Sequence, residues 1–138
     1  MRLIRKATSQ TVPLEDGFLW SDEFDWKPIE QNQERAVDGA LIVQEGKKKS
    51  GRPITLSPSD GQGWIKRSDL SVIQGWSALQ DEQFTLEFEY PHDNRQFNVI
   101  FNHSDGAINA KPVMGFPTVS DGDYYEVTLK FLEVEDAD

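Results

Sequence analysis

The sequence contains no cysteine among its 138 residues, which excludes a disulfide scaffold and a thiolate-ligated zinc site. It also has no apolar run near the ~18 residues that a membrane-spanning helix requires. The N-terminal stretch MRLIRKATSQTVPLEDG carries charge but no apolar segment long enough for a signal peptide. We therefore expect a protein that is made and used in soluble form, with no membrane insertion.

Positive charge is also scarce in this chain. Lysine and arginine number 14 against 24 aspartate and glutamate residues, so the net charge is −10. A surface this acidic repels phosphate groups, which argues against specific nucleic-acid binding and favours partners with a basic surface. The length fits one domain, and 37% hydrophobic with 11% aromatic residues is enough for one core.

Alternation of apolar and polar residues is the clearest structural signal. Phe84, Leu86, Phe88 and Tyr90 recur at every second position, which is typical of a half-buried strand. A second alternating run follows a Pro- and Asn-containing turn, PHDN, so the two runs are predicted to form a β-hairpin. The predicted hairpin strands are 83–90 and 95–103, and further strands are expected at 40–44, 53–57, 64–67, 107–114 and 125–131.

One short helix is predicted at about 69–79. Leu70, Ile73, Trp76 and Leu79 recur at spacings of three, and Ser68 is a good N-cap residue. Many short strands with one helix predict a mainly β fold, either an antiparallel barrel or a sandwich. We expect a single domain over 1–138, with an irregular N-terminal segment at about 1–38 and an acidic C-terminal tail at 133–138 that frays unless a partner holds it.

The segment EGKKKSGRPITL, residues 45–56, concentrates positive charge in an acidic protein. Gly46 and Gly51 have the spacing of a phosphate-binding loop, but the required lysine is missing after Gly51 and a strand-like run follows instead of a helix. Two interpretations remain open. The segment is a solvated hairpin loop, or it is a subunit-contact loop for an acidic partner, formed by Lys47, Lys48, Lys49 and Arg52.

The motifs of named enzyme classes are missing from this sequence. His92 and His103 each neighbour turn residues but no marked nucleophile, and a G-x-S-x-G elbow is absent. The carboxylates at 15–25 lack the spacing of a calcium-binding EF-hand loop, and we expect them to face water while the neighbouring aromatic residues anchor the segment. We expect no enzyme activity, no cofactor and no metal.

Four tryptophans are candidate aromatic anchors. Exposed tryptophans can form a platform on which sugar rings stack, whereas buried ones pack in a core or an interface. Packing is the interpretation we prefer, with a carbohydrate-binding module as the alternative function. The residues are Trp20, Trp26, Trp64 and Trp76.

The order of several segments resembles a known family. LWSDEFDWKPIEQ is followed by DGALIVQEG, GRPITL, GWIKRSDL, RQFNVIFNHSDGAINAKPV and YYEVTLKFLEV. This series resembles small β-rich tail and baseplate proteins of tailed phages and prophages, and is similar to the N-terminal barrel domain of distal tail proteins. The chain has no room for the extra carbohydrate-binding-like domain that distal tail proteins often carry.

The resemblance implies a non-enzymatic virion structural protein that forms symmetric rings at the baseplate or tail tip. It implies partners among tail tube, hub and baseplate proteins and among copies of the same chain. It also implies a location in the virion tail, after synthesis in the cytoplasm of a host bacterium. Ring contacts of this kind are heterologous, so each subunit presents two different faces.

Overall fold

The computed structural model describes residues 1–14, 18–48, 50–58, 63–90, 94–113 and 122–135. In this part of the chain no helix has the length and apolar character that a membrane span requires. The elements are β1 (Arg2–Arg5), β2 (Thr11–Pro13), β3 (Phe18–Trp20), β4 (Ile29–Arg35), β5 (Leu41–Lys47), β6 (Pro53–Pro58), β7 (Trp64–Lys66), α1 (Arg67–Ser77), β8 (Phe84–Glu87), β9 (Gln96–Phe101), the 3₁₀ helix η1 (His103–Asp105), β10 (Ile108–Pro112) and β11 (Tyr124–Glu133).

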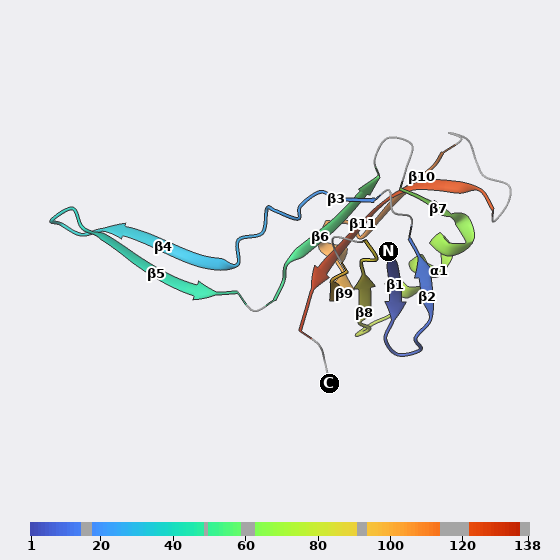
Figure 1. Ribbon diagram of the computed structural model, residues 1–138, viewed down its shortest axis with the longest axis horizontal. Coiled ribbons are helices and arrows are strands. Elements are labelled where there is room, and N and C mark those ends of the chain that lie inside the picture. Colours follow the sequence, from blue (N-terminus) through green and yellow to red (C-terminus); the bar gives the residue numbers. More distant parts are fainter. Residues whose placement is uncertain (15–17, 49, 59–62, 91–93, 114–121, 136–138) are drawn as a thin grey trace.

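Nine of the strands form one antiparallel sheet, which we call the body sheet; the body is this sheet together with α1. Seven of the strands follow the order β2-β1-β8-β9-β11-β6-β3, and β7 and β10 each pair with β11 beside this path. Strand β11 is its centre: β9 and β10 pair with successive parts of one edge, and β6 and β7 pair with the other. The sheet does not close into a barrel and is sandwich-like, which confirms the predicted mainly β fold with one short helix. Figure 1 shows these strands gathered around β11.

The body has a continuous apolar core because its strands alternate in burial. Phe84 and Leu86 of β8 are buried while Thr85 between them is half-exposed. Strand β8 pairs with β9 so that Phe84 faces Val99, which confirms the predicted hairpin, although turn residues 91–93 lie outside the described residues. Residues opposite each other on one sheet face pack together, so both strands contribute to the same core.

Helix α1 begins and ends two residues earlier than predicted. Its N-cap is Lys66 and makes no side-chain capping bond, so the prediction of Ser68 as N-cap was wrong. Ile73 and Trp76 are buried as the helical spacing predicted, but Leu79 lies beyond the helix and is 40% exposed. The buried stripe packs α1 against the body near β2, β7 and β11.

The N-terminal segment is not irregular, which corrects our expectation for 1–38. Strand β1 lies inside the body sheet between β2 and β8, and Leu3 is fully buried. Arg2 pairs with Glu87 of β8 at 2.8 Å, and the pKa of Arg2 is raised above its ordinary value by the hydrogen bond and the charge of that carboxylate. The start of the acidic tail is also held, because the Val134 N–H donates to the Asn98 carbonyl at 2.8 Å.

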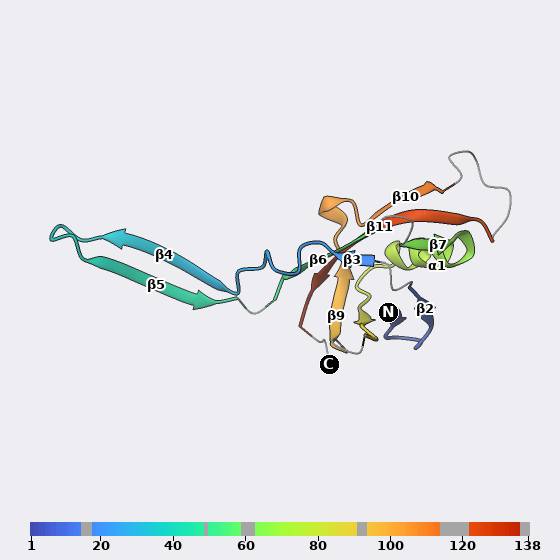
Figure 2. The same ribbon diagram turned by 45° about the horizontal axis from the view of Figure 1, so that its top comes forward.

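Strands β4 and β5 form a separate two-stranded sheet, which we call the arm. Figures 1 and 2 show it projecting from the body along the long axis of the molecule. Asp38 and Gly39 make its turn, and Gly39 has the positive φ of 88° that favours glycine. The segment 45–56 is therefore not a hairpin loop: its first residues complete β5, and it then returns to β6 in the body.

Candidate assembly surface

The arm is the most exposed structure in the described chain. All residues of β4 and β5 are exposed, including the apolar Ile29, Leu41, Ile42 and Val43. A two-stranded hairpin is at best marginally stable alone in water, because it buries too little apolar surface. Exposed apolar side chains on such an element are typical of a surface that a partner covers.

The register of the arm sorts its side chains onto two faces. Ile29, Arg35, Leu41 and Val43 lie on one face, which we call the odd face because its residues have odd numbers. On this face the Gln31 amide donates to Glu45 at 2.6 Å. The opposite, even face is more polar and carries Glu30, Asn32, Glu34, Ile42 and Gln44.

The base of the arm is closed by Lys48. The ammonium group of Lys48 lies 4.6 Å from the centroid of the Trp26 ring and 3.6 Å from the Glu30 carboxylate. The backbone N–H of Lys48 donates to the Pro28 carbonyl at 2.8 Å. These groups line a hollow of about 560 Å³. A cation over an indole face is attracted by the ring quadrupole, so Lys48 ties the return strand to the outgoing one.

Arg52 belongs to the body and does not form a common patch with the lysines. Its guanidinium lies 4.6 Å from the Trp20 centroid and donates to the Glu23 carbonyl at 2.9 Å. Arg95 approaches the same ring at 5.3 Å and pairs with the Glu23 carboxylate at 2.8 Å. Of the predicted contact loop, Lys47 is exposed on the arm, Lys48 is half-buried at its base, and Lys49 lies outside the described residues.

We expect Arg52→Ala to lower the free energy of unfolding by about 1–3 kcal/mol. It removes a cation–π contact and leaves the Glu23 carbonyl without its charged donor. The matched control is Lys47→Ala, which removes an exposed cation and should change stability by less than about 0.5 kcal/mol. Urea unfolding of both variants measures the difference. Equal effects in the two variants would contradict an anchoring role for Arg52.

The four tryptophans do not gather into one platform. Trp20 and Trp76 are buried, and each stacks on a phenylalanine, Trp20 on Phe88 at 5.4 Å and Trp76 on Phe84 at 5.5 Å. Trp26 packs under Lys48, and Trp64 lies 6.1 Å from the Tyr124 ring with half-buried surface. The two buried rings act as core anchors, and only Trp26 and Trp64 present any surface for a ligand.

The carboxylate segment at 15–25 differs from our expectation. Asp22 accepts hydrogen bonds from the Thr55 N–H at 2.8 Å and the Thr55 hydroxyl at 2.9 Å, so it fastens β3 to β6 instead of facing water. Phe24, expected to anchor the segment, is 92% exposed. Residues 15–17 lie outside the described residues. Within the described ranges, no three potential ligands gather into a metal site.

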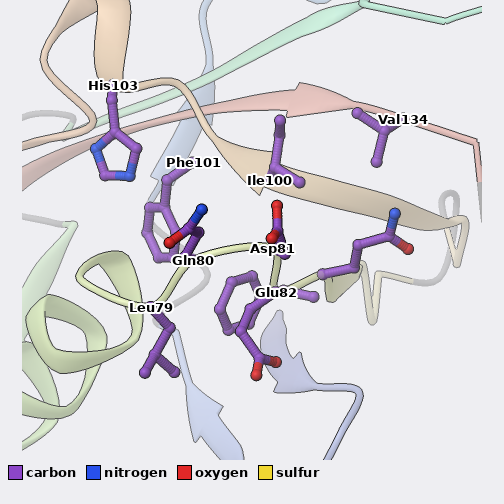
Figure 3. Close-up of a pocket in the computed structure, with 10 residues that line it drawn as sticks. Leu79, Gln80, Asp81, Glu82, Ile100, Phe101, His103 and Val134 are labelled. Atoms are coloured by element: carbon purple, nitrogen blue, oxygen red, sulfur yellow. The ribbon is translucent and has the colours of Figure 1, made fainter. Parts of the chain in front are cut away.

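A second hollow, of about 570 Å³, lies beside β8 and β9 (Figure 3). Its lining combines apolar side chains, among them Phe84, Phe101 and Val134, with Asp81 and His103. The His103 ring lies 6.2 Å from Phe101, and His92 falls outside the described residues. Among the residues that the structure describes, this lining includes neither serine nor threonine.

Comparison of the chain with models of known protein families, with curated proteins and with solved structures found no match. Of the residues predicted to form a subunit contact, Lys47 lies at the end of β5, Lys48 lies at the base of the arm, and Arg52 lies in the body. The signal that marks the arm is the apolar run Leu41, Ile42 and Val43, which looked like an ordinary strand.

Proposed function

We propose that this chain is a non-enzymatic structural protein of a phage or prophage-derived tail, and that its arm joins subunits into a ring at the baseplate or tail tip. The observation that carries the proposal is the arm itself, a projecting hairpin with exposed apolar residues and no buried side chain. The order of sequence segments that resembles tail proteins supports the setting, and the net charge of −10 suits a lumen that does not hold DNA phosphates.

The arm gives each subunit two different contact surfaces. One copy contributes the arm and its neighbour contributes a part of the body, which is a heterologous contact. Repetition of such a contact closes a ring when the rotation between copies allows it. The arm thus supplies, on one chain, the geometry that a ring-forming tail protein needs.

The test is assembly with tail components. The chain is mixed with the tail proteins encoded by neighbouring genes, and the mass of the complexes is measured by light scattering. We expect complexes that contain several copies of the chain. A strict monomer that associates with no tail component would overturn the proposal, and a tape-measure gene beside the coding sequence would support it.

The three lysines at 47–49 give a further prediction. Changing Lys47, Lys48 and Lys49 to Glu should weaken assembly, because it reverses the charge of Lys47 on β5 and of Lys48 at the base of the arm and removes the Lys48–Glu30 pair. The contacts of Lys48 with Trp26 and Glu30 hold the arm and not the core of the body, so the melting temperature of the body should change little. Light scattering and a thermal melt of the same sample measure both quantities. Unchanged assembly would show that charge at this end of the arm plays no part in the contact.

A further inference from the structure

We propose that the outer edge of β5 in the arm pairs with the outer edge of β10 in a second copy of the chain, so that the arm extends the body sheet of its neighbour. This inference rests on the proposed function, since it names the surface that receives the arm. Addition of a strand to an exposed sheet edge is a common way for proteins to bind one another.

The pairing of β10 with β11 determines which backbone N–H and carbonyl groups of β10 point away from the sheet. The Lys130 N–H donates to the Ala107 carbonyl at 2.9 Å, and the Val113 N–H donates to the Tyr124 carbonyl at 3.1 Å. In an antiparallel pair, bonded positions alternate with non-bonded ones, so the backbone groups of Ile108 and Ala110 point away from β11. Within the described part of the chain, β10 pairs with no other strand. Toward the rest of the described structure, both residues therefore present an unpaired N–H and an unpaired carbonyl.

The free groups on β5 are identified in the same way. The Ala36 N–H donates to the Ala40 carbonyl and the Lys48 N–H to the Pro28 carbonyl, each at 2.8 Å. Even-numbered residues of the arm therefore bond across it, and the backbone groups of Leu41 and Val43 point outward. In the described structure β5 pairs only with β4.

The side chains on the two free edges match each other. In antiparallel pairing, residues that face each other lie on the same side of the sheet, so Leu41 and Val43 would join Ile108 and Ala110 on one face. Ile108 and Ala110 line a hollow of about 430 Å³ against α1. The pairing therefore satisfies backbone donors on both chains and places two exposed apolar side chains beside a hollow whose lining combines apolar residues, such as Leu70 and Ile108, with polar ones, such as Gln74.

The other edge of the arm fits this site less well. The residues of β4 whose backbone groups point away from β5 include Gln31, Gln33 and Arg35. Pairing through β4 would therefore bring these polar side chains to the hollow beside Ile108 and Ala110. The apolar Leu41 and Val43 therefore favour β5 as the paired strand. Both unpaired edges belong to this chain, so a second copy is the partner that supplies the complement of each edge.

The positions of the two edges allow repeated pairing. Figures 1 and 2 show the arm at one end of the long axis and β10 toward the other end. A copy can therefore give its arm to one neighbour and receive an arm from another. Such head-to-tail contacts form rings when they close and filaments when they do not.

Disulfide formation between copies tests the pairing, because the chain has no cysteine of its own. A Val43→Cys chain is mixed with an Ile108→Cys or an Ala110→Cys chain and oxidised, since the facing position depends on the register of the pair. Facing residues that exchange backbone hydrogen bonds in an antiparallel pair have Cα atoms about 5.5 Å apart, a distance that a disulfide spans. The matched control is Gln33→Cys, which faces Val43 across the arm and lies one strand, ~5 Å, further from β10.

We expect a disulfide-linked dimer from Val43→Cys with one of the two β10 variants, and none from Gln33→Cys. A chain that carries both substitutions should give a ladder of linked products. Lack of dimer with either β10 variant, or equal dimer from the control, would overturn this pairing. If removal of the arm still abolished assembly, that result would leave the role of the arm intact and place its receiving surface elsewhere.

Discussion

A chain that lacks the arm should remain folded as a monomer and lose assembly. Residues 29–47 can be replaced by Asn-Gly, because the Lys48 N–H already donates to the Pro28 carbonyl at 2.8 Å, as in a two-residue hairpin turn. All side chains removed are exposed or half-exposed, so the unfolding free energy of the body should change by less than about 1 kcal/mol. Light scattering with tail partners measures assembly, and urea unfolding measures stability.

A pair of matched variants separates loss of the arm from loss of its contact surface. Leu41→Asp with Val43→Asp adds two negative charges to the edge of β5, and Gln31→Asp with Gln33→Asp adds the same charges to the same face on β4. We expect the first variant to behave like the chain without the arm. The second should keep most of its assembly, because it leaves the β5 edge and its apolar residues unchanged. Normal assembly of the chain without the arm would contradict the account.

Phe84→Ala should cause the largest loss of stability among single substitutions in the body. Phe84 is 1% exposed and packs between the Trp76 ring at 5.5 Å and the Phe101 ring at 5.2 Å. Its truncation leaves a cavity between β8, β9 and α1, and buried phenylalanine-to-alanine changes cost about 3–5 kcal/mol. Domains of this kind have a total stability of only about 5–15 kcal/mol. Urea unfolding followed by tryptophan fluorescence measures the effect.

The control for this prediction is Phe24→Ala, which removes the same atoms from a side chain that is 92% exposed. We expect its unfolding free energy to stay within about 0.5 kcal/mol of the original chain. Similar losses in the two variants would mean that Phe24 is covered in the folded protein or that Phe84 is not part of the core.

The body strands could be predicted because burial imposes a pattern on their sequences. Phe84 and Leu86, like Val127 and Leu129, alternate with half-buried residues because one face of each strand meets the core. Strand β1 was missed because it is short and only Leu3 within it is buried. Its place in the sheet depends on pairing with β8, more than 75 residues away along the chain, as the Arg5–Glu82 bond illustrates.

The arm could not be identified from the sequence because it has no buried face. Without a core to meet, β4 shows no alternation, and its sequence IEQNQER reads as a polar connection. The predicted contact residues do not form one patch for a related reason. Lys48 and Arg52 are close in sequence, but one side chain meets Trp26 and the other meets Trp20 in the body. Such contacts depend on how distant segments pack, which the local sequence does not record.

The most direct test of the central claim is to determine how many copies of the chain occur in one assembly. The intact chain is purified with its tail partners, the mass is measured by light scattering, and the particles are viewed by electron microscopy. The account predicts closed rings in which each copy, of 15.7 kDa, contacts two others through one arm and one body. Particles that contain a single copy, or symmetric pairs with free arms, would contradict it.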